Sequence, residues 1–225
     1  MRLHLQTLYT SDDLGRLVSV SDSSATLAPR FFLGRTAEGP VVAIGRDVPD
    51  SMVDELVALG SDVPLGMDAG APSNLFLQSV SNLLSAHQPV SKTWAGPNYR
   101  CPPGLPGADA TPITPANAAV LSPHLEPWLG DVAEGVPMAA FLLDGHAVSV
   151  CCSVRISDAA DEAGVETHPD FRGRGHAAAA VSAWSQAVRN AGREPLYSTS
   201  WDNGASQRVA TKLGLVQYGS VLHVT

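Results

Sequence analysis

Residues 167–178 combine residue types that suit the binding of a phosphate group. They read THPDFRGRGHAA and are predicted to run from the end of a strand through a loop into a helix. The first backbone N–H groups of a helix lack intrahelical partners and point outward together, so such a helix begins with an anion site. Gly173 and Gly175 remove the Cβ atoms that would keep a ligand from this backbone, and Arg172 and Arg174 add cationic donors. The expected ligand therefore carries phosphate.

The segments after this loop must hold it in place. Residues 176–190 are rich in alanine and carry Val181, Trp184 and Val188 at helical spacing, which predicts a helix with one apolar face. Residues 196–200 predict a short strand, and Asp202 and Asn203 can cap a second helix that ends near Leu213. The predicted order is strand, phosphate loop, helix, strand, helix.

This part of the chain resembles the GNAT superfamily of acyl-CoA-dependent N-acyltransferases. The acyl-CoA signature of that family is Gln/Arg-x-x-Gly-x-Gly/Ala, and its specified positions fall on Arg172, Gly175 and Ala177. A second family pattern, Asn-x-x-Ala/Ser followed by a helix ending in Lys-Leu-Gly-Phe, is matched by Asn203, Ser206, residues 212–214 and, less closely, Leu215. The resemblance covers roughly residues 113–225.

The resemblance implies a mixed α/β fold with the GNAT acyltransferase domain in residues 111–225. Residues 1–110 are expected to form a smaller N-terminal α+β domain of unknown role, which could be a diverged GNAT-like half. The boundary is placed near residue 110 because residues 96–115 are rich in proline and glycine and show little periodicity, as linkers do.

By the same resemblance, the protein is expected to transfer an acetyl or other acyl group from acyl-CoA to the amine of a small molecule or a peptide, by direct attack in a ternary complex. Acetyl-CoA or another acyl-CoA would be the co-substrate, and no metal is expected. Strand backbone would meet the pantetheine arm, the loop would bind the phosphates, and the second pattern would contact the cofactor. These expected cofactor-binding residues are Val165, Thr167, Arg172, Gly173, Arg174, Gly175, His176, Ala177, Asn203 and Ser206.

The candidates for the general base are three carboxylates on the strand before the loop, namely Glu166, Glu162 and Asp161, with Glu166 preferred. Many GNAT enzymes carry a tyrosine that protonates the thiolate of CoA, and by register this position is Ala210. Candidates for the acid remain by elimination only: Tyr197, Tyr218, His168, His176 and Cys151. A non-catalytic acyl-CoA-binding regulatory module is therefore the alternative function.

Other phosphate loops fit less well. Gly173, Gly175 and Ala178 also satisfy the dinucleotide pattern Gly-x-Gly-x-x-Ala, and Glu194 follows at the expected distance. However, Glu194 precedes the second strand instead of ending it, and too little chain remains for a Rossmann sheet. The absence of Gly-Lys-Ser/Thr excludes a nucleotide P-loop.

Composition narrows the class of protein. The chain has 225 residues, of which 44% are hydrophobic and 16% charged, which argues against disorder. The formal charge of -8 is shared evenly between the halves, so no nucleic-acid partner is expected. The three cysteines are expected to be buried free thiols in a reducing cytosol. No Cys/His spacing suggests a zinc site. No signal peptide or membrane span is apparent, and the expected location is cytoplasmic without membrane contact.

The first half carries no motif for chemistry. Its predicted elements are a helix near residues 12–20, a hairpin formed by residues 30–35 and 41–46, and helices over residues 51–59 and 73–87. In the second half, strands are predicted over residues 137–143, 146–156, 161–167 and 216–224.

Overall fold

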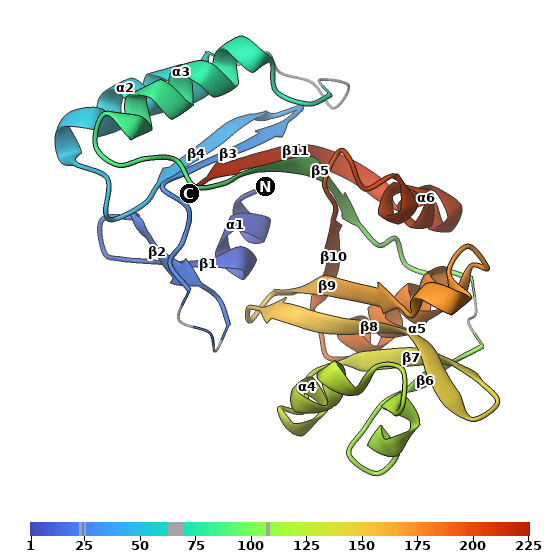
Figure 1. Cartoon of the computed structure of the whole chain (residues 1–225). Helices are drawn as coiled ribbons and strands as arrows, with labels where there is room; N and C mark the ends of the chain where they lie inside the picture. Colours follow the sequence, from blue (N-terminus) through green and yellow to red (C-terminus); the bar gives the residue numbers. More distant parts are fainter. Residues whose placement is uncertain (23, 25, 63–69, 107–108) are drawn as a thin grey trace. The chain divides into compact units, whose positions relative to one another are not determined.

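The computed structural model describes residues 1–22, 24, 26–62, 70–106 and 109–225 and has the expected mixed α/β fold (Figure 1). Its contacts divide the chain into two compact units. Unit 1 contains Met1–Tyr99, Ser198–Gly204 and Gln217–Thr225, and unit 2 contains Arg100–Tyr197 and Ala205–Val216. The end of the chain thus returns to the first unit. These units are defined by contacts within the fold, and the predicted domain boundary near residue 110 remains a prediction.

Unit 1 is built on four strands in the order β4-β3-β11-β5. The strands β3 and β4 pair in antiparallel register from Phe31↔Ile44 to Thr36↔Gly39, which confirms the predicted hairpin. The two predicted helices over residues 51–59 and 73–87 are also present, as α2 and α3. The elements of this unit are α1 (Arg2–Leu8), β1 (Tyr9–Ser11), β2 (Leu17–Val20), β3 (Phe31–Thr36), β4 (Gly39–Ile44), α2 (Asp50–Ser61), α3 (Asn74–Ser85), β5 (Thr93–Arg100) and β11 (Val216–Val224).

Hydrophobic side chains cover both faces of this sheet. On one face Phe31, Leu33 and Leu222 pack with residues of α2 and α3. On the other, Phe32 and Val221 pack with residues of α1, β1 and β2. Figure 1 shows the corresponding layers of unit 1, with α2 and α3 on one side of β3 and β4 and with α1, β1 and β2 on the other.

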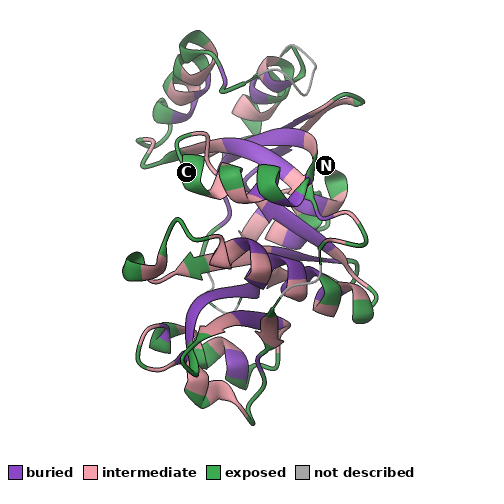
Figure 2. Cartoon of the chain, turned by 90° about the vertical axis from the view of Figure 1, so that its right-hand side faces the viewer, coloured by how far each residue is buried: buried purple, intermediate pink, exposed green. Residues whose placement is uncertain are grey.

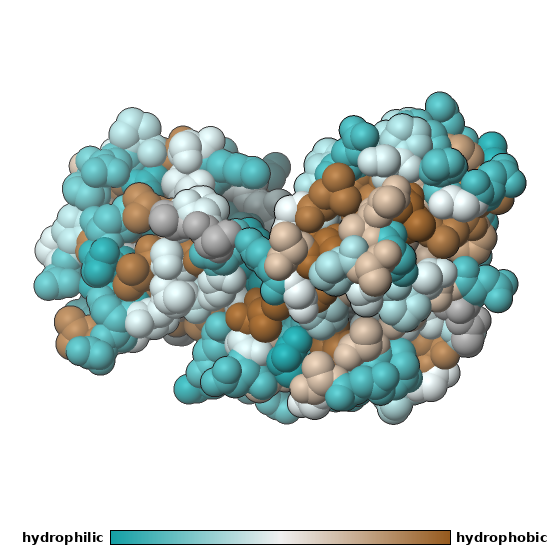
Figure 3. Space-filling view, turned by 90° about the horizontal axis from the view of Figure 1, so that it is seen from below, coloured by the Kyte–Doolittle hydropathy of each residue, from teal (hydrophilic) through white to brown (hydrophobic). Residues whose placement is uncertain are grey.

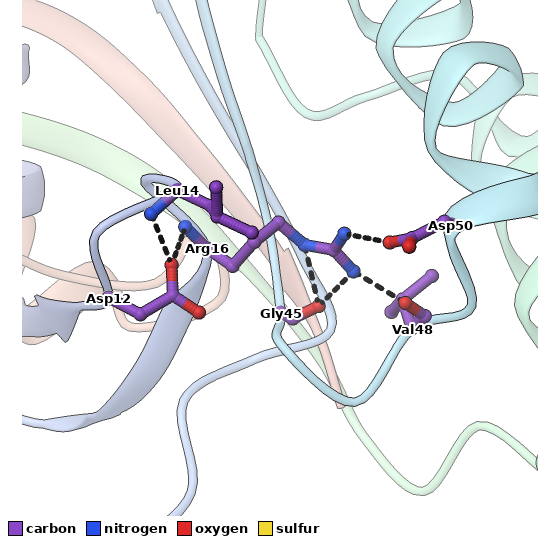
Figure 4. A network of polar contacts seen from close by, with 6 residues as sticks. All are labelled: Asp12, Leu14, Arg16, Gly45, Val48 and Asp50. Carbon is purple, nitrogen blue, oxygen red and sulfur yellow. Dashed lines mark hydrogen bonds and ion pairs between the residues drawn. The ribbon is translucent and has the colours of Figure 1, made fainter.

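The predicted helix near residues 12–20 is wrong, because a turn and the strand β2 occupy this segment. The carboxylate of Asp12 accepts hydrogen bonds from the backbone N–H groups of Leu14 and Arg16, at 3.0 and 2.9 Å, and Gly15 has φ +76° (Figure 4). An aspartate that bonds to the backbone two residues ahead favours a turn over a helix. The guanidinium of Arg16 then donates to the carbonyl of Gly45 and to Asp50.

The predicted linker over residues 96–115 is also wrong in part, because it contains the second half of β5 and the short strand β6. Gly96 is buried, and a Cβ atom there would lie 1.8 Å from the carbonyl oxygen of Thr199. The glycine therefore marks a close approach of two backbone segments inside a sheet, not a flexible connection.

Unit 2 carries five strands in the order β10-β9-β8-β7-β6, in which β10 and β9 are parallel and the other pairs antiparallel. The predicted strands of this half, its phosphate loop and the helix after the loop all have counterparts. The elements are β6 (Ala110–Pro112), the 3-10 helices η1 (Ala118–Leu121) and η2 (Glu126–Trp128), α4 (Leu129–Ala133), β7 (Met138–Leu143), β8 (His146–Ile156), β9 (Ala160–Thr167), the 3-10 helix η3 (Pro169–Phe171), α5 (His176–Asn190), β10 (Glu194–Ser198) and α6 (Gly204–Leu213).

The long helix α5 packs against β6, β7, β8 and β9. Its apolar face is fully buried at Val181, Trp184 and Val188, as the spacing of these residues predicts. A second core, which includes Leu121, Leu125 and others, joins η1, η2 and α4 to β7 and β8. In Figure 2 the strands contain long buried stretches, whereas the helices carry both buried and exposed residues.

The surface is mixed in character, with hydrophobic residues among hydrophilic ones on the face shown in Figure 3. Leu129 and Leu143 are among the large hydrophobic residues exposed in unit 2. No helix of the described segments is long and apolar enough to cross a membrane.

Candidate functional site

One edge of β9 is open next to the predicted phosphate loop. On its β8 side the strand is paired from Ile156↔Asp161 to Ser149↔Thr167. On its β10 side the register covers only Ala160, Asp161 and Glu162, although β9 continues to Thr167. Within the described chain, the stretch that contains Val165 and Thr167 has no strand partner on this side. Apart from the carbonyl of Thr167, which accepts a hydrogen bond from Arg172, its backbone can therefore bond to an extended ligand.

The loop that follows β9 has the conformation that its glycines permit. After η3, Gly173 has φ +76° and Gly175 has φ +89°, and both values lie in the left-handed region. Gly175 is the N-cap residue of α5, and its carbonyl accepts from the N–H of Ala178 at 3.1 Å. The loop thus ends at the positive end of a helix of 15 residues, with His176 and Ala177 in its first turn.

The two loop arginines are exposed and differ in their contacts. The Nε atom of Arg172 donates to the carbonyl oxygen of Thr167 at 3.0 Å, so this side chain ties the loop back to the end of β9. The guanidinium of Arg174 lies 5.6 Å from the ring centre of Phe171. Arg174 can swing toward an anion at a small cost, because an exposed cation–π contact contributes only about 0.5–1 kcal/mol.

A third cation, Lys212, reaches this loop from α6. A Cβ atom on Gly175 would lie 2.4 Å from the Nζ atom of Lys212, so the ammonium group sits directly over the glycine. Sequence reasoning missed this contact and used Lys212 only as part of a family pattern. Its position one residue before the end of α6 could not be related to Gly175 without the fold.

His176 is the first residue of α5, and its ring stacks on Phe141 with 4.2 Å between ring centres. Burial lowers the pKa of His176, and the charges of Arg174 and Lys212 lower it further. A lowered pKa favours the neutral imidazole, which leaves the positive charge of the loop to the arginines and the lysine.

Asp161 has a structural environment. It is fully buried and forms an ion pair with Arg193, while Ser153 Oγ donates to its Oδ2 atom at 2.6 Å. The hydrogen bond to Asp161 raises the pKa of Arg193 above its usual value. A buried carboxylate held by two donors is a poor choice for a base that must meet a substrate.

The other two carboxylates differ in exposure. Glu162 is 4% exposed and lies in register with Leu196 of β10 and Arg155 of β8. Glu166 is exposed and accepts a hydrogen bond from Trp128 Nε1 at its Oε2 atom, at 2.6 Å. Of the three carboxylates, Glu166 alone is exposed to solvent and lies one residue before the end of β9.

Ser206 and Asn203, the two remaining cofactor candidates, lie in different places. Ser206 belongs to α6, and its hydroxyl shares a hydrogen bond of 2.6 Å with the hydroxyl of Tyr197 on β10. Burial raises the pKa of Tyr197 to about 12, which makes this phenol a weak acid. Asn203 is exposed just before α6 and groups with unit 1, so its contact with the cofactor stays a prediction. Ala210 is 1% exposed.

All three cysteines are free and buried, as predicted. Burial raises the pKa of Cys101 to about 12 and raises the pKa of Cys151 and of Cys152 as well. Thiols of this kind are poor nucleophiles because they stay protonated. Among the residues that the structure describes, no three His, Cys, Asp or Glu side chains are grouped so as to hold a metal ion.

Comparison with protein families gives one match, in which residues 139–220 fit the GNAT acetyltransferase family. The matched segment contains β9, the loop, α5, β10 and α6. A search of curated proteins found no match.

A search of solved structures gave several matches at low sequence identity. A GNAT-family acetyltransferase from Colwellia psychrerythraea has 14% identity and a TM-score of 0.50, over 95% of this chain and 79% of that chain. A GNAT-family acetyltransferase from Novosphingobium aromaticivorans has 16% identity and a TM-score of 0.49 over 60% of this chain, which spans 65% of that structure. An aminoglycoside N-acetyltransferase in complex with CoA has 21% identity and a TM-score of 0.37, over 49% of this chain and 92% of that chain.

Proposed function

We propose that this protein transfers an acetyl or other acyl group from acyl-CoA to the amine of a small molecule or a peptide, because residues 139–220 match the GNAT acetyltransferase family. We also propose that the protein is cytoplasmic, because its three cysteines are free thiols and not disulfides.

The observation that carries the proposal is the open edge of β9 beside the phosphate loop. A CoA molecule has a diphosphate at one end and a chain with amide groups leading to its thiol. The loop and Lys212 offer N–H groups and cations to the diphosphate. The unpaired backbone around Val165 offers strand-like hydrogen bonds to the amide groups of the chain. The two features adjoin in the order in which the ligand needs them.

The charge of unit 2 favours a cationic acceptor. Between Arg100 and Arg155 the sequence has no lysine or arginine, whereas it has the acidic residues Asp109, Glu126, Asp131, Glu134 and Asp144. This segment contains η2 and α4, and Trp128 of η2 touches Glu166. An amine is protonated near neutral pH and would be attracted to such a surface.

In the reaction that we propose, the neutral amine nitrogen attacks the acyl carbonyl carbon, a C–N bond forms and the C–S bond breaks. Glu166 takes the proton that the nitrogen loses, a role that contributes about 10²–10⁴ in rate. A backbone N–H at the open edge of β9 stabilises the carbonyl oxygen as it gains charge. The CoA thiolate leaves and is protonated by water, because a thiol with a pKa of about 8.5 is a tolerable leaving group near neutral pH.

The direct test measures CoA release with a thiol reagent, using acetyl-CoA and a panel of amines. The panel contains polyamines, lysine peptides, aminoglycosides and neutral aromatic amines. We expect acetyl-CoA to bind and at least one cationic amine to be acetylated. Binding without any turnover, also with longer acyl-CoA donors, would favour the regulatory module that Ala210 keeps open as the alternative.

A further inference from the structure

The indole of Trp128 makes a polar contact that links two parts of unit 2 that are distant in the sequence. Its Nε1 atom donates to Oε2 of Glu166 at 2.6 Å, although the two residues are 38 positions apart in the chain. Trp128 ends η2, in the connection between β6 and β7, and Glu166 lies near the end of β9. The contact is short for an N–H donor, as is usual when the acceptor is ionised.

Gly164 makes room for this indole. A Cβ atom at Gly164 would lie 3.1 Å from Trp128 Cη2 and 2.2 Å from Cγ1 of Val154. Gly164 and Glu166 are two residues apart on β9, so their side-chain positions lie on the same face of the strand. The indole therefore lies beside the strand at Gly164 with its N–H directed along the strand to the carboxylate.

The donor is fixed at its other end by hydrophobic packing. Trp128 packs on the core that contains Leu121, Leu125 and Val132, and its backbone N–H donates to the carbonyl of Leu125 at 3.1 Å. An exposed glutamate samples several rotamers, whereas a glutamate bonded to an anchored donor is held in one of them. The Oε1 atom of Glu166 accepts no hydrogen bond from any described residue and is left for a substrate.

We propose that Trp128 is a positioning residue of the acyl-transfer reaction, which acts by holding the Glu166 carboxylate in the orientation that accepts the proton of the amine. This inference rests on the proposed function. Folding alone does not require the contact, because at this exposed edge water could satisfy the indole N–H and the carboxylate equally well.

The test compares Trp128→Phe, which keeps a ring on the core and removes the N–H, with Glu166→Gln and the double variant. Trp94→Phe is the control, because Trp94 is a half-buried tryptophan of unit 1 that packs edge-on against His223. Steady-state rates are measured with acetyl-CoA and an amine found in the panel. We expect Trp128→Phe to lower kcat about five- to tenfold while the KM for acetyl-CoA changes less than twofold.

The double variant separates positioning from a structural effect. In the double variant the losses should not multiply, because without the carboxylate the N–H has nothing to position. Losses that multiply, or full activity of Trp128→Phe, would overturn the inference and leave the proposed function standing. Full activity of Glu166→Gln would show that Glu166 is not the general base and that Trp128 does not position one.

A measurement without turnover examines the same contact. The protein has four tryptophans, and the indole N–H signal that disappears in Trp128→Phe identifies Trp128 in an NMR spectrum. We expect this signal to change its chemical shift in Glu166→Gln, because the carboxylate that accepts the hydrogen bond of the indole is replaced by an amide. An unchanged signal would show that the carboxylate is not the partner of this indole.

Discussion

Gly173 and Gly175 share a left-handed backbone but differ in their surroundings. A Cβ atom on Gly173 would meet nothing within 4 Å, whereas one on Gly175 would meet the ammonium of Lys212. At Gly173 the requirement is conformational. At Gly175 a side chain would also separate the backbone of the loop from the cation brought by α6.

We predict that Gly175→Ala weakens acetyl-CoA binding at least tenfold, about 1.4 kcal/mol or more. The left-handed conformation also strains an alanine by about 1–2 kcal/mol, a cost to the stability of the protein that the control variant shares. Gly192→Ala is the matched control, because Gly192 has φ +79°, has nothing within 4 Å of its added Cβ, and follows the other end of α5. Titration calorimetry on the three proteins measures the difference. Equal affinities for the two variants would remove Gly175 from the binding site.

Lys212 gives a second prediction at this scale. Lys212→Ala should weaken acetyl-CoA binding about tenfold, because a charged hydrogen bond to phosphate contributes about 1.5–3 kcal/mol and this side chain is exposed. Binding of acetyl-pantetheine without phosphates should not change. Arg208→Ala removes the same charge from the exposed surface of the same helix and should have little effect. If Arg208→Ala weakens binding as much, the effect of Lys212 is one of net charge only.

The elements of the second half of the sequence were predictable where local signals and tertiary structure agree. The helix over residues 176–190 and the strand over residues 216–224 have the expected bounds, because apolar periodicity, glycine stops and burial coincide there. Proline and glycine misled the prediction of β5, since Gly96 serves a close backbone contact inside the sheet. The segment before β2 forms a turn instead of the predicted helix, because the side chain of Asp12 accepts hydrogen bonds from the backbone.

The site could be predicted only as far as it is continuous in sequence. The loop and the strand before it could be proposed as candidates because their residues are neighbours in the sequence. The three carboxylates could be ranked only by their distance in sequence from the loop, since the ion pair of Asp161 with Arg193 and the bond of Glu166 to Trp128 depend on how strands and connections are packed. Lys212 reaches Gly175 for the same reason.

Helix α6 provides the prediction at the scale of elements. Ser206 and Ala210 are four residues apart and share one face of the helix, where Ala210 is buried. Ala210→Tyr would overfill this face, at a cost of about 1–3 kcal/mol in the free energy of unfolding. We expect a lower melting temperature and no more than a modest gain in CoA release. A hundredfold gain would show that the natural protein is a cofactor binder without a working active site.

At the scale of the whole molecule, distant segments of the chain meet in unit 1. His4 of α1, Asn98 of β5 and Tyr218 of β11 form one buried hydrogen-bonded group, and His4 is 1% exposed. Burial lowers the pKa of His4 to about 3, with smaller effects from the charge of the N-terminus and from His223. The folded protein therefore keeps this histidine neutral.

This environment predicts how stability depends on pH. The unfolded chain binds a proton at His4 below a pKa of about 6.5 and the folded chain does not, so stability falls as the pH drops from 6.5 toward 3. By pH 5 the loss from His4 is about 2 kcal/mol. His223, whose pKa burial lowers to about 4, acts in the same direction. Urea denaturation at pH 7.5 and pH 5 measures the loss. His4→Asn should reduce it, whereas replacement of the exposed His87 by Asn should leave it unchanged.

The last strand of the chain determines whether unit 1 can form. In that unit β11 lies between β3 and β5, although it follows them by more than a hundred positions in sequence. Leu222 is 1% exposed and belongs to the core beneath α2 and α3, whereas Val216 on the same strand is 41% exposed. Leu222→Ala should therefore lower the free energy of unfolding by about 2–5 kcal/mol, as deletion of a buried leucine side chain does. Val216→Ala should change it by less than about 0.5 kcal/mol, as an exposed substitution does. Denaturant unfolding of both variants measures these values, and similar values for the two would show that β11 is not a central strand of this unit.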